Sequence, residues 1–123
     1  MVWETRKILG DQSIMVNPTT VRRPVAFGHP EAVRIETRTR VTVQRAQKLL
    51  NSAPGVIVMD GREPGMCPTP NDAAHRDGVY VGRLREDISH PRGLDLWIVA
   101  DNVRKGAALN GVQIAEVLAK DFM

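Results

Sequence analysis

The sequence has 123 residues, of which 42% are apolar and 25% charged. These proportions are those of an ordinary globular domain and exclude a disordered chain. Seventeen Lys and Arg against 14 Asp and Glu give a net charge of +3, which suits an anionic small molecule as well as nucleic acid. The single cysteine, Cys67, excludes an internal disulfide. No signal peptide and no apolar run long enough to span a bilayer are present, so we expect a soluble, cytoplasmic protein.

The first part of the chain predicts one short helix followed by three strands. Residues 2–9 have helical spacing and end at Gly10, a residue type that terminates helices. β-branched residues favour strands at 14–16 and 20–27, although a proline interrupts this stretch twice. Between residues 31 and 43, apolar and threonine side chains alternate with charged ones, which indicates a long strand with one polar face. The charged side chains of this face are Arg34, Glu36, Arg38 and Arg40.

The rest of the chain alternates between helix and strand. Helical spacing over 42–52 predicts a helix with Thr42 as its N-cap. Strands are expected at 56–59, 79–85 and 94–100, with a long polar loop at 60–77 between the first two. The pattern over 102–120 predicts a final helix, with Asp101 or Asn102 as its cap. We therefore expect one α+β domain over 1–123, a mixed sheet with helices on one face.

The most suggestive polar residues lie between Arg22 and His29. An arginine can bind a carboxylate through two parallel hydrogen bonds, and a histidine can transfer protons near neutral pH. Gly28 leaves the backbone free to bend before His29, and the two side chains can share one small site only if the chain does bend between them. Taken without further information, a Gly-His pair is more often structural than catalytic. His75 and His90, in polar loops, are weaker candidates.

A second candidate is the start of the final predicted helix. A helix N-terminus beside the amide of Asn102 can bind an anion or a carboxamide, although a merely capped helix explains the same residues equally well. Cys67 lies in a loop without a predicted helix N-terminus or histidine to activate it, so we interpret it as a non-nucleophilic thiol. The sequence contains no glycine-rich dinucleotide motif, P-loop or metal-ligand spacing, and metal ligands are therefore not predicted.

Several blocks of the sequence, in this order, resemble the C-terminal half of the bacterial aspartate-β-semialdehyde dehydrogenases, and the resemblance covers essentially the whole chain. The block at 94–110 is the most specific, because its LDLWIVADNVRKGAALN sequence is closely similar to the family's pattern. The remaining similar blocks are residues 4–11, 20–25, 28–29, 67–70, 72–74 and 81–85.

This resemblance implies an activity and three functional residues. Members of the family reductively dephosphorylate L-aspartyl-4-phosphate to L-aspartate 4-semialdehyde with NADPH, in the biosynthesis of lysine, threonine and methionine. The resemblance implies that His29 is the acid/base that activates the thiol nucleophile, that Arg22 binds the substrate α-carboxylate, and that Asn102 contacts the nicotinamide cofactor. NADP and aspartyl phosphate, or phosphate in the reverse reaction, are then the expected ligands.

The departures from the family pattern are as informative as the matches. The family's nucleophilic cysteine, the glutamine beside it, the glycine-rich dinucleotide loop and the Glu/Lys pair that binds substrate would all precede this chain. We therefore expect the NADP-binding domain to be absent and the isolated chain to be inactive. Pro30 replaces the serine that is common after the histidine, and Arg23 precedes Pro24 where valine is usual.

The resemblance also implies a fold and an assembly. The chain would form part of the glyceraldehyde-3-phosphate dehydrogenase-like catalytic and dimerisation domain, in which the sheet forms a homodimer through its uncovered face. The arginine-rich face of residues 31–43 would then lie at or near the interface. Two alternatives stay open: a non-catalytic dimerisation or binding module derived from this domain, and a small basic nucleic-acid binder that uses the arginines at positions 22, 23, 34, 38 and 40.

Overall fold

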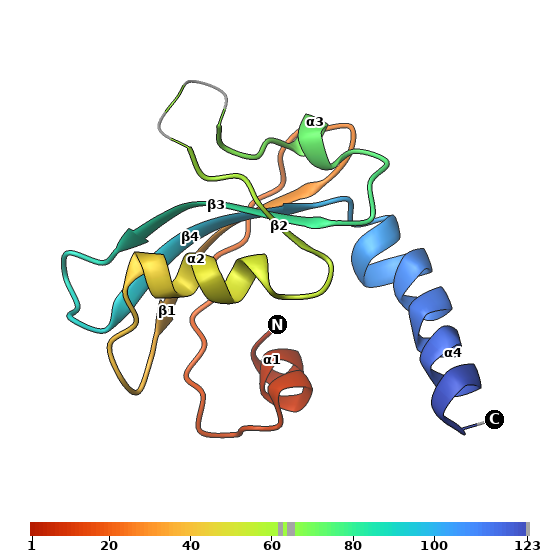
Figure 1. Cartoon of the computed structure of the whole chain (residues 1–123), viewed down its shortest axis with the longest axis horizontal. Helices are drawn as coiled ribbons and strands as arrows, with labels where there is room; N and C mark the ends of the chain where they lie inside the picture. Colours follow the sequence, from red (N-terminus) through yellow and green to blue (C-terminus); the bar gives the residue numbers. More distant parts are fainter. Residues whose placement is uncertain (62, 64–65, 123) are drawn as a thin grey trace.

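The computed structural model describes residues 1–61, 63 and 66–122, and its centre is a four-stranded mixed sheet (Figure 1). The strand order is β1 (His29–Glu36), β4 (Gly93–Ala100), β3 (Val79–Glu86) and β2 (Val56–Val58). β4 pairs antiparallel with both β1 and β3, whereas β2 pairs parallel with β3. The expected α+β architecture with a mixed sheet is thereby confirmed.

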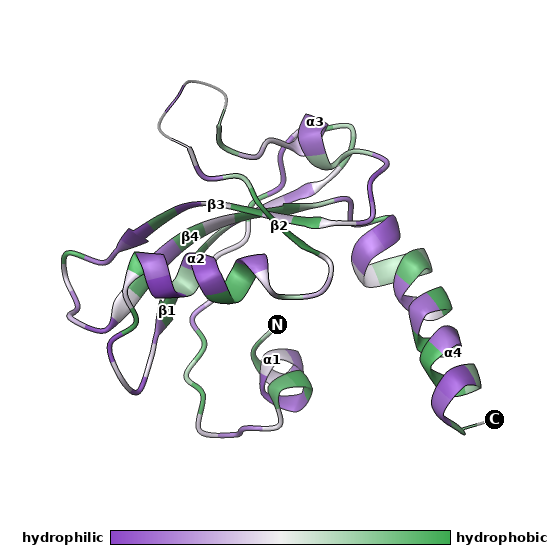
Figure 2. Ribbon diagram, viewed as in Figure 1, coloured by the Kyte–Doolittle hydropathy of each residue, from purple (hydrophilic) through white to green (hydrophobic). Residues whose placement is uncertain are grey.

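Helix α2 (Val43–Asn51) covers one face of the sheet, and the larger part of the core lies beneath it. As predicted, Thr42 caps this helix, because its side chain accepts a hydrogen bond from the backbone N–H of Arg45. Figure 2 shows that α2 is amphipathic, with apolar and hydrophilic residues segregated along its length. Burial of its apolar side against β2 and β3 stabilises the helix, which is too short to be stable in isolation. The buried residues of this cluster are Ala46, Val81, Leu84 and Leu94.

One end of the opposite face is covered by the segment between β2 and β3, which contains the short helix α3 (Pro70–Ala73). Ala73 of this segment is fully buried and packs in one cluster with Tyr80 and Val99. The indole N–H of Trp97 donates to the carbonyl of Pro68 over 2.9 Å. The predicted long loop at 60–77 therefore contains a helical turn that sequence patterning missed. Residues 62, 64 and 65 of that loop lie outside the described part of the chain.

Three N-terminal predictions have different outcomes. Helix α1 (Val2–Leu9) ends, as expected, at Gly10 in the left-handed conformation. Residues 14–16 and 20–27 are irregular and not the predicted strands. Pro18, between the two segments, and Pro24, within the second, lack the backbone N–H that a sheet would need. The predicted strand at 31–43 is wrong at both ends, because β1 spans 29–36. After β1 the Thr37 hydroxyl donates to the carbonyls of Thr39 and Arg92, which turns the chain towards α2.

The C-terminal helix begins later than predicted. Residues 104–108 form an irregular turn, η1 (Arg104–Ala108), in which Gly106 has a positive φ of 93°. The continuous helix α4 (Leu109–Phe122) starts after it, and the side chain of Asn110 accepts a hydrogen bond from the backbone N–H of Gly106. The predicted helix at 102–120 is therefore corrected to 109–122.

Helix α4 projects away from the sheet and buries none of its residues (Figure 1). Apolar residues lie along its exposed surface (Figure 2). They are Val112, Ile114, Val117, Leu118 and Phe122. None of the described helices has the length and apolar character that a membrane crossing requires.

Candidate functional site

The pairing of β1 with β4 brings two of the three predicted site residues to the same end of the sheet. His29 is the first residue of β1 and lies opposite Ala100, the last residue of β4. Asn102 follows Ala100 by two positions and is half-buried, whereas the side chain of His29 is exposed. Residues from distant parts of the sequence are thus neighbours here, because an antiparallel register places the start of one strand beside the end of the other.

Gly28 is the residue that allows the chain to enter β1 at this point. It is buried and has a φ of 88°, which L-amino acids with a side chain rarely adopt. A Cβ atom at this position would lie 3.3 Å from the carbonyl oxygen of Ala100 and 3.4 Å from Cβ of Pro70. The geometry of the turn therefore favours glycine at position 28, and the turn sets where the imidazole of His29 leaves the backbone.

Asp101 fixes the backbone on the other side of the site. It is 1% exposed, and its carboxylate accepts hydrogen bonds from the backbone N–H groups of His75 over 2.8 Å and Val103 over 3.0 Å. The hydrogen bond from His75, followed by those from Val103 and Arg104, lowers the pKa of Asp101 against the opposing effect of burial. Of the two predicted caps, Asp101 is the one whose side chain accepts a backbone hydrogen bond, and the turn that it caps holds Asn102.

His75 and Phe27 complete this end of the sheet, and sequence reasoning gave no role to Phe27 and little to His75. Their rings lie with centroids 4.5 Å apart and planes at 58°. His75 also has a positive φ of 60°, which is uncommon for a residue other than glycine. The contact depends on the approach of the α3 segment to residues preceding β1, and no local sequence pattern reports such an approach.

Arg22 lies in the irregular segment before β1, and its side chain is exposed. The chain does bend between Arg22 and His29, because the N–H of Val25 donates to the carbonyl of Arg23 across Pro24 over 2.9 Å, and Gly28 then turns the backbone again. Within the described residues, no hydrogen bond or ion pair joins Arg22 to His29 or to Asn102. That Arg22, His29 and Asn102 bind one common ligand stays a prediction.

Two surface hollows of the described chain are not lined by His29. One runs along α4, and the other is formed by Cys67 with residues of the Asp60 turn and of β3, including Arg83 and Arg85. His29, Asn102 and Phe27 line neither hollow, and a common site for His29 and Asn102 stays a prediction. Among the residues that the structure describes, no three His, Cys, Asp or Glu side chains gather as metal ligands.

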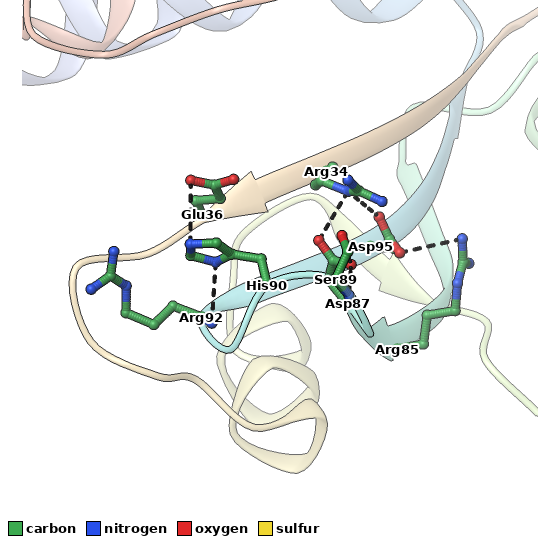
Figure 3. Close-up of polar contacts among 8 residues, drawn as sticks. All are labelled: Arg34, Glu36, Arg85, Asp87, Ser89, His90, Arg92 and Asp95. Atoms are coloured by element: carbon green, nitrogen blue, oxygen red, sulfur yellow. Dashed lines mark hydrogen bonds and ion pairs between the residues drawn. The ribbon is translucent and has the colours of Figure 1, made fainter.

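Arg34, on the arginine-rich face of β1, forms ion pairs within the chain (Figure 3). Arg34 Nε lies 3.2 Å from carboxylate oxygens of both Asp87 and Asp95, and Asp95 also pairs with Arg85 over 3.6 Å. Hydrogen bonds from the backbone and hydroxyl of Ser89 lower the pKa of Asp87, whose side chain is 1% exposed.

Two further arginines of this region also face carboxylates. Arg38 lies 3.8 Å from Asp11, and Arg40 pairs with Glu86 over 2.7 Å. Three of the five arginines proposed for nucleic-acid binding are thus partly neutralised, which weakens that alternative because phosphate binding depends on uncompensated positive charge.

Comparison with known proteins shows the family of the chain. Residues 1–105 match the dimerisation domain of semialdehyde dehydrogenases. An aspartate-semialdehyde dehydrogenase from Legionella pneumophila is 58% identical over 124 residues, and one from Aquifex aeolicus is 49% identical over 121 residues. The alignments cover 100% and 98% of this chain and 36% of each relative. The chain thus spans little more than a third of the length of these relatives.

Solved structures show the same relationship. The crystal structure of aspartate semialdehyde dehydrogenase II complexed with ASA from Vibrio cholerae has a TM-score of 0.94 and 52% identity, and the match covers 100% of this chain and 36% of that one. The Candida albicans enzyme with NADP has a TM-score of 0.61 and 28% identity over 78% of this chain and 31% of that one. The sheet, its register and the sequence match lead to one conclusion: this chain belongs to the semialdehyde dehydrogenase dimerisation-domain family.

Proposed function

We propose that this chain is the dimerisation and acid/base portion of an aspartate-semialdehyde dehydrogenase, the remainder of which carries the nucleophile and the nucleotide-binding domain. The proposed reaction is the reductive dephosphorylation of L-aspartyl-4-phosphate to L-aspartate 4-semialdehyde. The observation that carries the proposal is the convergence of His29 and Asn102 at one end of the sheet, through the His29–Ala100 pairing, in a chain that belongs to this family.

His29 is the proposed acid/base. Its backbone is fixed by pairing with Ala100 and by the Gly28 turn, while its side chain is exposed and therefore accessible to a substrate. An imidazole held in this way can take the proton of a thiol nucleophile and later return a proton to an oxygen of the reacting centre. The thiol itself is proposed to come from the remainder of the enzyme, since Cys67 lines a hollow that His29 does not line.

Arg22 and Asn102 are the proposed binding residues. The exposed guanidinium of Arg22 can bind the α-carboxylate of the substrate with two charge-assisted hydrogen bonds. The amide of Asn102 can contact the carboxamide of a nicotinamide cofactor, and its position is set by the turn that Asp101 caps. NADPH, when bound, would supply the hydride of the reductive reaction, and most of its site would lie on the remainder of the enzyme.

The assembly proposed for this domain is a homodimer formed through the sheet. A match to a dimerisation domain supports a dimer, and the mixed charges of Arg34, Asp95 and Arg85 on one sheet face suit pairing across a two-fold axis. We also propose a role in amino-acid biosynthesis and a cytoplasmic location. Both proposals rest on the match of this chain to aspartate-semialdehyde dehydrogenases.

A chimera tests the proposed function directly. In it, this chain replaces the matching segment of the Legionella pneumophila relative, and NADP reduction by aspartate semialdehyde and phosphate is followed spectroscopically. We expect the chimera to turn over and the isolated 123-residue chain to be inactive, because it lacks the nucleophile.

Within the chimera, His29→Asn should reduce kcat by about 10²-fold or more, the usual contribution of a general acid/base. The matched control is His90→Asn, because His90 lies beside Glu36 at the opposite end of β1. Near-normal turnover of the His29 variant would refute the acid/base role. A folded but inactive chimera beside an active parent enzyme would favour a non-catalytic module.

A further inference from the structure

His75 has a left-handed backbone conformation, which is uncommon for a residue other than glycine, although histidine adopts it more often than most. Its φ is 60°, and Arg83 is the other non-glycine residue with a positive φ in the described chain. Such a conformation persists only where surrounding interactions hold it, and these positions are concentrated at functional sites. Here the N–H of His75 donates to the carboxylate of Asp101, which is 1% exposed and cannot move towards solvent without losing its partners.

His75 is an exposed residue, and its ring makes a second contact within the chain. It packs against Phe27, with ring centroids 4.5 Å apart. Phe27 is joined to His29 through Gly28, which is itself confined between the Ala100 carbonyl and Pro70. The backbone of His75 therefore holds the Asp101 turn, and its ring holds the chain that leads into His29.

We propose that His75 is a positioning residue for His29, a role that rests on the function proposed above. Its aromatic ring holds Phe27, and Phe27 in turn restricts the Gly28 turn from which His29 projects. The interplanar angle of 58° is a tilted aromatic contact. Ring packing is the property used, so another aromatic side chain at position 75 can replace the imidazole.

Two substitutions in the chimera separate ring packing from other effects. His75→Gly removes the ring and relieves the positive φ, whereas its N–H can still donate to Asp101. We expect kcat to fall about tenfold to a hundredfold, as small misplacements of a catalytic group do, with the KM for NADP little changed. His75→Phe keeps a ring against Phe27 and should restore kcat to within about threefold, with the shape of the pH profile of kcat unchanged.

Arg83→Gly is the matched control, because it relieves a positive φ of similar size, 53°, at a position whose neighbours are Cys67 and Arg85 and not His29. It should leave kcat unchanged. Normal kcat in His75→Gly would overturn the proposal. Equal losses in His75→Gly and His75→Phe would also overturn it, since the imidazole itself would then be required.

The His29→Asn variant of the same chimera distinguishes failure of this inference from failure of the proposed function. If His29→Asn is inactive and His75→Gly is fully active, the positioning role alone is wrong. If His29→Asn is active, the acid/base role is wrong, and the positioning role that depends on it is also lost.

Discussion

Replacing Gly28 by alanine tests the geometry that places His29. An alanine with a φ of 88° incurs the left-handed backbone penalty of about 1–2 kcal/mol. Its Cβ would also lie 3.3 Å from the Ala100 carbonyl oxygen, which must then move by a few tenths of an ångström, and in ordinary contact with Cβ of Pro70 at 3.4 Å. That adjustment adds about 1 kcal/mol, the low end of overpacking costs, and gives a total of about 2–3 kcal/mol.

Gly55→Ala provides the matched control. Gly55 has a φ of 74°, and a Cβ there would meet nothing within 4 Å. This variant therefore carries the backbone penalty of about 1–2 kcal/mol alone. The position precedes β2, at the edge of the sheet opposite to β1, so the His29 turn is not disturbed.

Two measurements separate the variants. Urea unfolding of the 123-residue chain should show Gly28→Ala about 1 kcal/mol less stable than Gly55→Ala. In the chimera, Gly28→Ala should lower kcat about tenfold or more, because the strain is applied next to the acid/base, and Gly55→Ala should leave kcat unchanged. Equal stability of the two variants together with normal kcat in Gly28→Ala would refute the view that this turn positions His29.

Two further predictions concern stability. Leu94 is 1% exposed, so Leu94→Ala should lower the free energy of unfolding by about 2–5 kcal/mol. The control Ile88→Ala, at a fully exposed side chain, should change the free energy of unfolding by less than about 0.5 kcal/mol. Similar urea midpoints for the two variants would contradict the assignment of Leu94 to the core. Folding lowers the pKa of Asp101 below its ordinary value of 3.8, chiefly through the hydrogen bond from the His75 N–H. The ionised carboxylate therefore stabilises the folded chain fully above pH 3.8, and this stabilisation is lost as the pH falls through the lower pKa of the folded state. Thermal melts of the chain should therefore lose more stability on acidification below about pH 4 than melts of Asp101→Asn, and parallel pH dependences would show that Asp101 does not contribute.

Local sequence signals predicted those elements that local physics determines. Thr42 caps α2 and Gly10 ends α1 because each acts on the backbone within a few residues of itself. The alternating pattern of β1 was extended too far, since threonines and arginines continue the alternation after Glu36. Beyond Glu36 the strand ends, and the Thr37 hydroxyl donates to the carbonyl oxygens of Thr39 and Arg92. The competing contact comes from a distant turn, and periodicity does not report it.

The candidate site was predictable only in part for the same reason. His29 and Asn102 could be identified from family resemblance, whereas their proximity depends on the register of β1 against β4. The roles of Asp101 and His75 as backbone partners depend on the fold bringing together residues that lie 26 positions apart. Composition alone would assign both residues to the surface, although the carboxylate of Asp101 is buried.

The location of His29 on β1 links the site to an edge strand of the sheet. β1 contains no buried residue and hydrogen-bonds only to β4, while the core beneath α2 is built from other elements. Local opening of β1 would therefore separate His29 from Asn102 without unfolding the core. The fraction of molecules competent for proton transfer is then governed by the free energy that holds one edge strand in place, which amide hydrogen exchange of β1 would report.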